Sequence, residues 1–172
     1  MGTAVVANIA GEDEDQFVAM AERLGVEPGI AAVELNVSCP NVATGLDIGA
    51  VPAELEAVVG RVRAVTGKPL IVKLTPNTAD VSRCAQAAEA AGADAISLVN
   101  TLRAVPLHPD GSGARWLGGR QGGLSGPAIR VVALHAADLL SAGATLVAVG
   151  TESFRDPAAG ARVAAELADL LA

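Results

Sequence analysis

Pro-Leu-Ile-Val-Lys-Leu, residues 69–74, is the stretch that decides the fold, because it is an apolar run interrupted by one cation near its end. A continuous apolar run of this length is typical of a strand buried in a parallel sheet. Apolar residues at helical spacing precede it: Leu55, Val58, Val59, Val62 and Val65. A second helical stripe, which includes Cys84 and Ala88, follows it. The run therefore predicts a strand between two helices.

The same alternation of apolar run and helical segment continues in both directions along the chain. Further strands are predicted at residues 4–9, 32–37, 95–99 and 145–149, and a Gly-rich segment occupies residues 102–126. The acidic run at residues 12–15 favours a helix start, because carboxylates suit the positive end of a helix dipole. The pattern predicts one α/β domain over residues 1–172, with about five parallel strand–helix units. It leaves open whether the sheet is a closed barrel or an open, doubly wound sheet.

Composition and charge exclude several classes of function. The net charge of −7 and the lack of a Lys/Arg cluster argue against a nucleic-acid partner. No secretory signal is visible, and polar residues interrupt the apolar stretch at residues 131–150, so we expect a cytoplasmic protein without a membrane span. Cys39 and Cys84 fit no disulfide framework, and His108 and His135 lack a third ligand, so no metal site is expected.

Polar residues recur where the predicted strands end. They are Asn8, Asn36, Lys73, Asn100, Thr101, Gly150 and Thr151. In both parallel architectures, chemistry gathers at the carboxyl ends of the strands. Packing does not explain five strands that each deliver a polar group to one edge, so the sequence predicts a functional site there.

Glu-Leu-Asn-Val-Ser-Cys-Pro-Asn, residues 34–41, is the most specific segment of the chain, and it resembles the catalytic loop of the dihydroorotate dehydrogenases. Further matches occur in the family's order at residues 8–11, 72–77, 99–101, 122–129 and 147–151. Cys39, together with Gly-Leu-Ser-Gly-Pro-Ala at residues 123–128, is similar to class 1B. In that branch, an FMN-binding catalytic subunit couples to NAD through a separate iron–sulfur FAD electron-transfer subunit.

The resemblance implies FMN-dependent oxidation of dihydroorotate to orotate in pyrimidine biosynthesis. Cys39 would be the base that removes a proton from carbon 5, because only a deprotonated sulfur accepts the proton. The substrate-binding residues implied are Asn36, Asn41, Asn100 and Thr101. The cofactor-binding residues implied are Asn8, Asn36, Lys73, Val99, Gly126, Gly150 and Thr151. Lys73 would place a cation near the pyrimidine edge of the flavin and stabilise the charge of the reduced ring.

The chain also departs from the family's pattern. A full (β/α)₈ barrel takes about 250 residues. This chain begins at what would be the family's third strand, and the seventh-strand region expected after residue 134 is absent. Five predicted strands cannot close an eight-stranded barrel, so we expect an incomplete TIM-type (β/α)₈ barrel. Tight FMN binding by this chain alone is therefore not expected.

Three interpretations follow from the sequence. The first is a dihydroorotate dehydrogenase, the second is a non-catalytic remnant of that family, and the third is a dihydropyrimidine dehydrogenase-like domain. Gly-Gly-Leu-Ser-Gly-Pro-Ala at residues 122–128 favours the first over the third. Cys84 lies on an apolar helical stripe and is interpreted as a core residue. Lys73 has an alternative interpretation as a strand-end lysine that extends its ammonium group to solvent.

Overall fold

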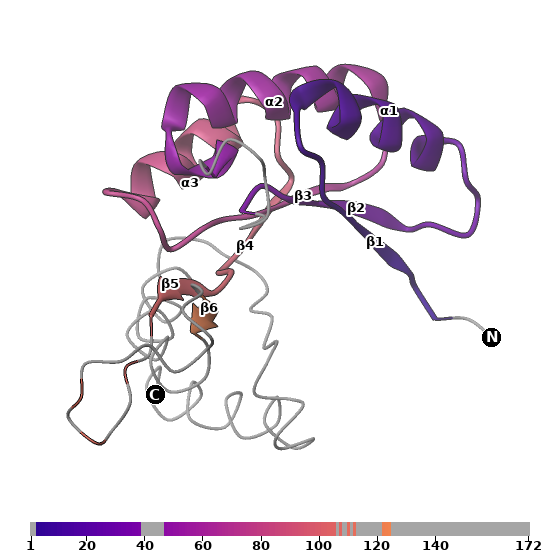
Figure 1. The fold of residues 1–172 in the computed structure, drawn as a ribbon. Helices are drawn as coiled ribbons and strands as arrows, with labels where there is room; N and C mark the ends of the chain where they lie inside the picture. The colour runs from indigo at the N-terminus through magenta and orange to yellow at the C-terminus, as the bar shows by residue number, and fades with distance from the viewer. Residues whose placement is uncertain are drawn as a thin grey trace, which may run out of the picture. The chain divides into compact units, whose positions relative to one another are not determined.

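A computed structural model describes residues 3–38, 47–105, 107, 110, 112 and 122–124 of the 172-residue chain. The chain divides into two compact units, residues 1–100 and residues 101–172. In the first unit, three helices lie on one face of a four-stranded sheet (Figure 1). No helix in the described ranges is long and apolar enough to cross a membrane.

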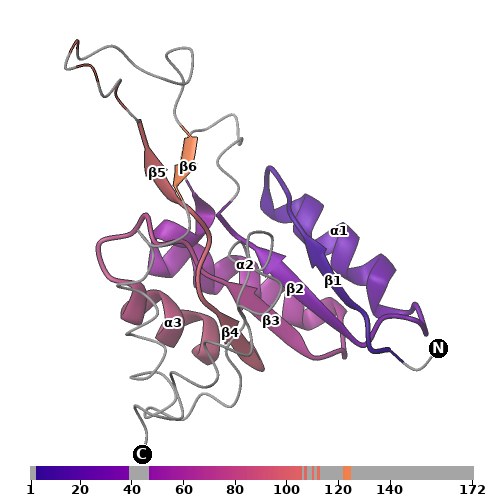
Figure 2. The ribbon, with the colours of Figure 1, turned by 90° about the horizontal axis from the view of Figure 1, so that it is seen from below.

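The sheet of the first unit is parallel throughout. Its strands are β1 (Val6–Ile9), β2 (Ala32–Asn36), β3 (Leu70–Lys73) and β4 (Ala95–Ser97). They are hydrogen-bonded in the order β1-β2-β3-β4, which Figure 2 shows from below. Each strand falls inside one of the predicted ranges, so four of the five predicted parallel strands are confirmed. The fifth, residues 145–149, lies outside the described residues.

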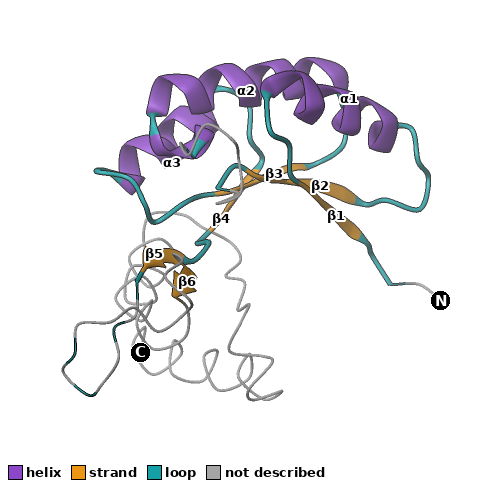
Figure 3. Cartoon of the chain, viewed as in Figure 1, coloured by secondary structure: helices purple, strands orange, loops and turns teal. Residues whose placement is uncertain are grey.

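A helix joins each strand to the next, and the three helices cover the same face of the sheet (Figure 3). They are α1 (Glu14–Gly25), α2 (Pro52–Val65) and α3 (Val81–Ala90), and a short 3₁₀ turn, η1 (Ile48–Ala50), precedes α2. Asp13 and Asp80 begin α1 and α3, because each side chain accepts a hydrogen bond from a backbone N–H of the first turn. Proline at the first position of α2 loses no helical hydrogen bond there.

The core lies between the sheet and this helical layer. Successive strand residues point to opposite faces, so every second residue of β2 and β3 enters the core. The strand residues that do so are Val33, Leu35, Leu70 and Val72, and the helices contribute Phe17, Ala21, Leu55, Val58, Val59, Val62, Cys84 and Ala88. The predicted helical stripes are therefore confirmed, and Cys84 is a fully buried core residue.

The one-sided arrangement of the helices decides between the two parallel architectures. In a doubly wound sheet helices cover both faces, whereas in a TIM-type barrel they form a single outer ring. Within the described residues, the helices of the first unit lie on one face only (Figure 3). The unit is thus a segment of an incomplete TIM-type (β/α)₈ barrel, as the sequence predicted.

The second unit contains a short antiparallel pair of strands that the sequence did not predict. Strands β5 (Leu102–Ala104) and β6 (Gly122–Leu124) pair with Leu102 opposite Leu124. Thr101 lies so close to Gly123 that a Cβ atom on this glycine would collide with the threonine side chain. Residues 125–172 of this unit, with the strand predicted at residues 145–149, lie outside the described residues. A single domain over residues 1–172 stays a prediction.

Leu35→Ala is expected to lower the free energy of unfolding by about 2–5 kcal/mol, because it leaves a cavity in a closely packed core. Leu35 is 0% exposed, whereas Leu107 is 57% exposed. The matched variant Leu107→Ala is therefore expected to change the free energy of unfolding by less than about 0.5 kcal/mol. Urea denaturation measures both values, and equal losses would contradict the assignment of the core.

Candidate functional site

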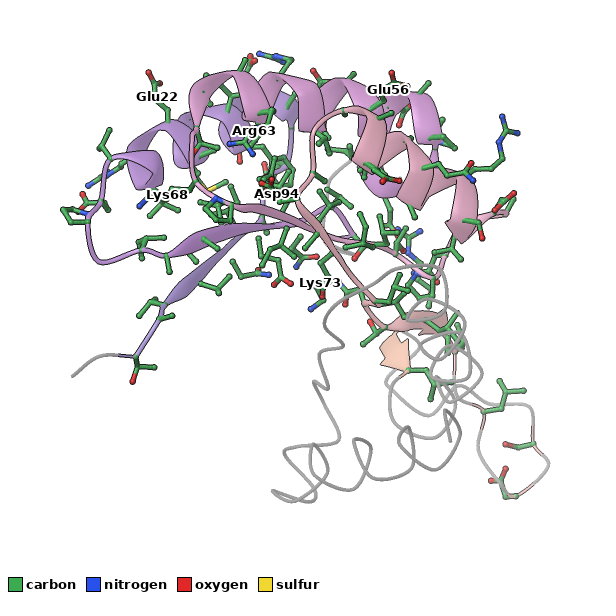
Figure 4. All side chains as sticks on the ribbon, turned by 180° about the vertical axis from the view of Figure 1, so that it is seen from behind. Glu22, Glu56, Arg63, Lys68, Lys73 and Asp94 are labelled. Atoms are coloured by element: carbon green, nitrogen blue, oxygen red, sulfur yellow. The ribbon has the colours of Figure 1, made fainter. Side chains whose placement is uncertain are left out.

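Polar side chains line up where β2, β3 and β4 end. Asn36 and Lys73 are the last residues of their strands and lie opposite each other in the register, and Ser97 lies opposite Lys73 on the other side. Strands in a sheet are about 4.8 Å apart, so these three side chains are direct neighbours on one face. It is the face turned away from the helices, and Figure 4 shows Lys73 pointing in that direction.

Asn100 connects the ends of the three strands. Its backbone N–H donates to the Leu74 carbonyl oxygen at 3.0 Å, which holds the chain after β4 against the end of β3. Its side-chain Nδ2 donates to Asn36 Oδ1 at 2.9 Å and to the Ser38 carbonyl oxygen at 3.3 Å. The predicted gathering of Asn36, Lys73 and Asn100 at one edge is therefore confirmed.

These contacts fix the direction of the Asn36 amide. Asn36 Oδ1 accepts from Asn100 Nδ2 and also from Ser38 Oγ, at 3.3 Å. A carbonyl oxygen has two lone pairs, so both are occupied. Across the described part of the chain, the Asn36 Nδ2 group donates to no residue. Asn36 therefore presents N–H donors to any ligand on this face.

The Asn8 amide is oriented the other way from that of Asn36, so it presents an acceptor rather than donors. It lies opposite Glu34 in the register, and its Nδ2 donates to the Glu34 carboxylate. An ionised carboxylate can only accept, so the NH₂ end of the amide is directed at Glu34 and Oδ1 is directed away from it. Sequence reasoning missed the role of Glu34. Its position two residues before Asn36 was the available signal, because strand residues two apart share a face.

Lys73 differs from the other cations near the sheet. It is half-buried, yet in the described ranges it makes no hydrogen bond and no ion pair. Lys68 instead donates to the carbonyl oxygens of Glu27 and Ile30, at 2.9 and 2.5 Å, and Arg63 pairs with Asp94 at 2.9 Å. The three cations and Asp94 are labelled in Figure 4. A half-buried cation without a protein partner on a polar face suits an anionic ligand.

The other predicted site residues are placed less completely. Val99 is half-buried in the chain that leads from β4 to Asn100, and Thr101 begins the second unit. The remaining predicted site residues lie outside the described residues: Cys39, Asn41, Gly126, Gly150 and Thr151. No group of three His, Cys, Asp or Glu side chains in the described part of the chain is placed to hold a metal ion.

Comparison with known proteins matches this chain to one family. The family model described as dihydroorotate dehydrogenase matches residues 1–140. The dihydroorotate dehydrogenase B (NAD(+)) catalytic subunit of Desulforudis audaxviator is 43% identical, over 97% of this chain and 62% of that protein. The subunit of the same name from Geobacter sulfurreducens is 39% identical, over 100% of this chain and 64% of that protein. The dihydroorotate dehydrogenase A (fumarate) of Lacticaseibacillus paracasei is 38% identical, over 95% and 65%.

The match includes the whole candidate site in the first unit. The chain spans 62–65% of the length of these three relatives. Residues 1–140 contain every described strand and helix, and with them the aligned polar residues at the ends of β2, β3 and β4. The resemblance based on residues 34–41 is thereby confirmed for the family. The chain belongs to the dihydroorotate dehydrogenase family.

Proposed function

We propose that the chain carries the site for FMN-dependent oxidation of dihydroorotate to orotate, a step of pyrimidine biosynthesis. The observation that supports this most directly is the convergence of Asn36, Lys73 and Asn100 on the helix-free face of the sheet. They meet at the carboxyl ends of parallel strands, where TIM-barrel active sites lie.

The residues present fit a flavin. The pyrimidine ring of a flavin alternates carbonyl acceptors with an N–H donor, so it needs protein groups of both polarities. Asn36 offers donors and Asn8 offers an acceptor, because their hydrogen bonds to Asn100 and Glu34 direct the two amides. Lys73 would stabilise negative charge on the reduced ring. We assign the FMN phosphate to Gly126, Gly150 and Thr151 from the family motifs, and we place Val99 beside the ring.

The substrate would lie on the same face. Asn36 and Asn100, with Asn41 and Thr101, would bind the carbonyl and N–H groups of the dihydroorotate ring. The Cys39 thiolate would take the proton from carbon 5, and a double bond forms between carbons 5 and 6. Bound FMN would supply the acceptor for the hydride that leaves carbon 6.

We infer that a second subunit takes the electrons onward. Two of the relatives are named as catalytic subunits of NAD(+)-dependent enzymes, which supports an iron–sulfur FAD electron-transfer subunit as the partner. The motif at residues 122–128 favours the same branch. A thiol base must stay reduced, so we place the protein in the cytoplasm.

Because tight FMN binding is not expected from this chain alone, FMN is added in excess to the purified chain. A saturable quench of flavin fluorescence is expected, and dihydroorotate is expected to bleach the yellow colour of the bound flavin. The physical reason is that the described residues supply both amide polarities and a cation on one face. Fluorescence titration and absorbance spectroscopy measure the two steps. A chain that stays folded but binds no FMN would be a non-catalytic remnant, and the proposal would be wrong.

Lys73→Met and Lys68→Met are expected to change different properties of the protein. The first should weaken FMN binding, and the second should lower stability. Lys73 has no partner in the described residues, so its loss should weaken FMN binding about 10- to 100-fold with little effect on stability. Lys68 donates to two backbone carbonyl oxygens, so its loss should lower the free energy of unfolding by about 1–3 kcal/mol and leave FMN binding unchanged. Fluorescence titration and urea denaturation separate these outcomes. Unchanged FMN binding in Lys73→Met would remove Lys73 from the cofactor site.

Cys39→Ala is expected to lower turnover of dihydroorotate by at least about 100-fold, because the variant lacks the thiolate that would accept the proton from carbon 5. FMN binding should be retained, because the sulfur is not assigned to the cofactor. The control is Cys84→Ala, which changes a fully buried core thiol on α3 and should leave the specific activity of the folded protein unchanged. Steady-state kinetics and FMN titration provide both values. Full activity of Cys39→Ala would exclude Cys39 as the base.

A further inference from the structure

Glu34 and Lys73 carry opposite charges on the same face of the sheet. Glu34 lies on β2, opposite Asn8 on β1 and opposite Ile71 on β3. Lys73 follows two residues after Ile71, so its side chain points to the same face as that of Glu34. The spacing and rise of strands place the Cα atoms of Glu34 and Lys73 about 8 Å apart. Both side chains are long enough to meet across that distance.

Glu34 is the only acidic residue on this face of strands β1 to β4. Successive strand residues alternate between the two faces, and the register fixes which residues share a face with Lys73. The others on that face are Val6, Asn8, Ala32, Asn36, Ile71, Ala95 and Ser97. Any ion pair between Lys73 and a residue of these strands would therefore be an ion pair with Glu34.

The Glu34 carboxylate is nevertheless bonded to Asn8. Asn8 Nδ2 donates to Glu34 Oε2, whereas Lys73 has no ion-pair partner within the described ranges. β1 and β3 flank β2 on opposite sides, so a carboxylate held toward Asn8 is held away from Lys73. A hydrogen bond to a charged group stabilises more than an ion pair near the surface, because that ion pair must hold two long side chains and is screened by salt. The bond to Asn8 is therefore the more stable arrangement of Glu34.

We propose that Asn8 is a positioning residue for Glu34, which keeps this carboxylate from pairing with Lys73. The ammonium group of Lys73 then stays available to a ligand with negative charge. This inference rests on the proposed role of Lys73 at the flavin. It gives Asn8 a second role, which depends on the NH₂ end of its amide rather than on the oxygen assigned to the flavin ring.

The test compares Asn8→Ala, Glu34→Gln and the double variant Asn8→Ala/Glu34→Gln in the full chain. Asn8→Ala removes the donor that holds the carboxylate, Glu34→Gln removes the charge, and the double variant removes both. Asn8 is exposed, so its truncation leaves no cavity in the core. If Asn8→Ala does not fold, Asn8→Val replaces it, because valine favours strands and also lacks a donor.

Acetylation of the lysines is measured without FMN. A limiting amount of acetic anhydride is added, and mass spectrometry gives the extent of reaction at each lysine. Lys68 and Lys73 are the only lysines of the chain, so Lys68 is the internal reference. Lys68 precedes β3 and donates to the carbonyl oxygens of Glu27 and Ile30, and none of the variants changes these partners.

Asn8→Ala is expected to lower the reactivity of Lys73 about two- to fivefold relative to Lys68, because an ion pair with Glu34 protects the amine. The double variant should restore the reactivity of the original chain, since glutamine carries no charge. Glu34→Gln alone should leave the reactivity unchanged. A merely structural effect of the loss of Asn8 would not be reversed by a second substitution at Glu34.

FMN titration tests the link to the cofactor. Asn8→Ala and the double variant both lack the Asn8 oxygen, so that loss cancels when the two are compared. Glu34→Gln should therefore strengthen FMN binding about two- to fivefold more in the Asn8→Ala background than in the original chain. Equal effects in the two backgrounds would overturn the role of Asn8 in keeping Lys73 available to the ligand.

Three results of the acetylation would also overturn the inference: no fall in Asn8→Ala, a fall that persists in the double variant, or an equal fall in Glu34→Gln alone. Failure of the proposed function is a separate result. A folded chain that binds no FMN would contradict the proposed function, but acetylation would still show whether Glu34 pairs with Lys73 once Asn8 is lost. The two ideas can therefore fail independently.

Discussion

The register between parallel strands is the constraint on which both the core and the candidate site depend. Along β2 and β3, alternate residues point to opposite faces, so Leu35 and Val72 enter the helical core while Asn36 and Lys73 face away from it. A slip by one residue would direct the lysine into the core and expose the leucine. The burial of apolar side chains under α2 therefore also places the polar side chains in one row.

Structural features that depend on the local sequence pattern could be predicted from the sequence. Apolar runs predicted the strands, residues at helical spacing predicted the buried faces of the helices, and the acidic run before α1 predicted its start, where Asp13 is the cap. The gathering of Asn36, Lys73 and Asn100 was also predictable, because parallel strands that are joined by helices end at the same edge. The alternation of strands and helices along the chain was enough to predict which edge of the sheet carries these residues.

Features that depend on contacts between distant residues were not predictable. The Asn8–Glu34 and Asp47–Thr75 hydrogen bonds join residues 26 and 28 positions apart, and they need the register and the loop path to be known first. The β5–β6 pair was missed because Gly122 and Gly123 have low strand propensity. The sequence pattern also could not show that the helices occupy one face, since an apolar run is compatible with helices on either side.

The Asn8–Glu34 contact explains why an acidic residue lies on the face proposed for an anionic cofactor. A carboxylate beside such a ligand is unfavourable in charge, but it accepts hydrogen bonds and never donates them. Glu34 thereby turns the Asn8 amide so that its oxygen faces away from the carboxylate. Packing in the core fixes the position of the backbone and of the Cβ atom, but a terminal amide or hydroxyl group can still rotate. At Asn8 the carboxylate partner removes that freedom, so a ligand meets an acceptor that is already oriented.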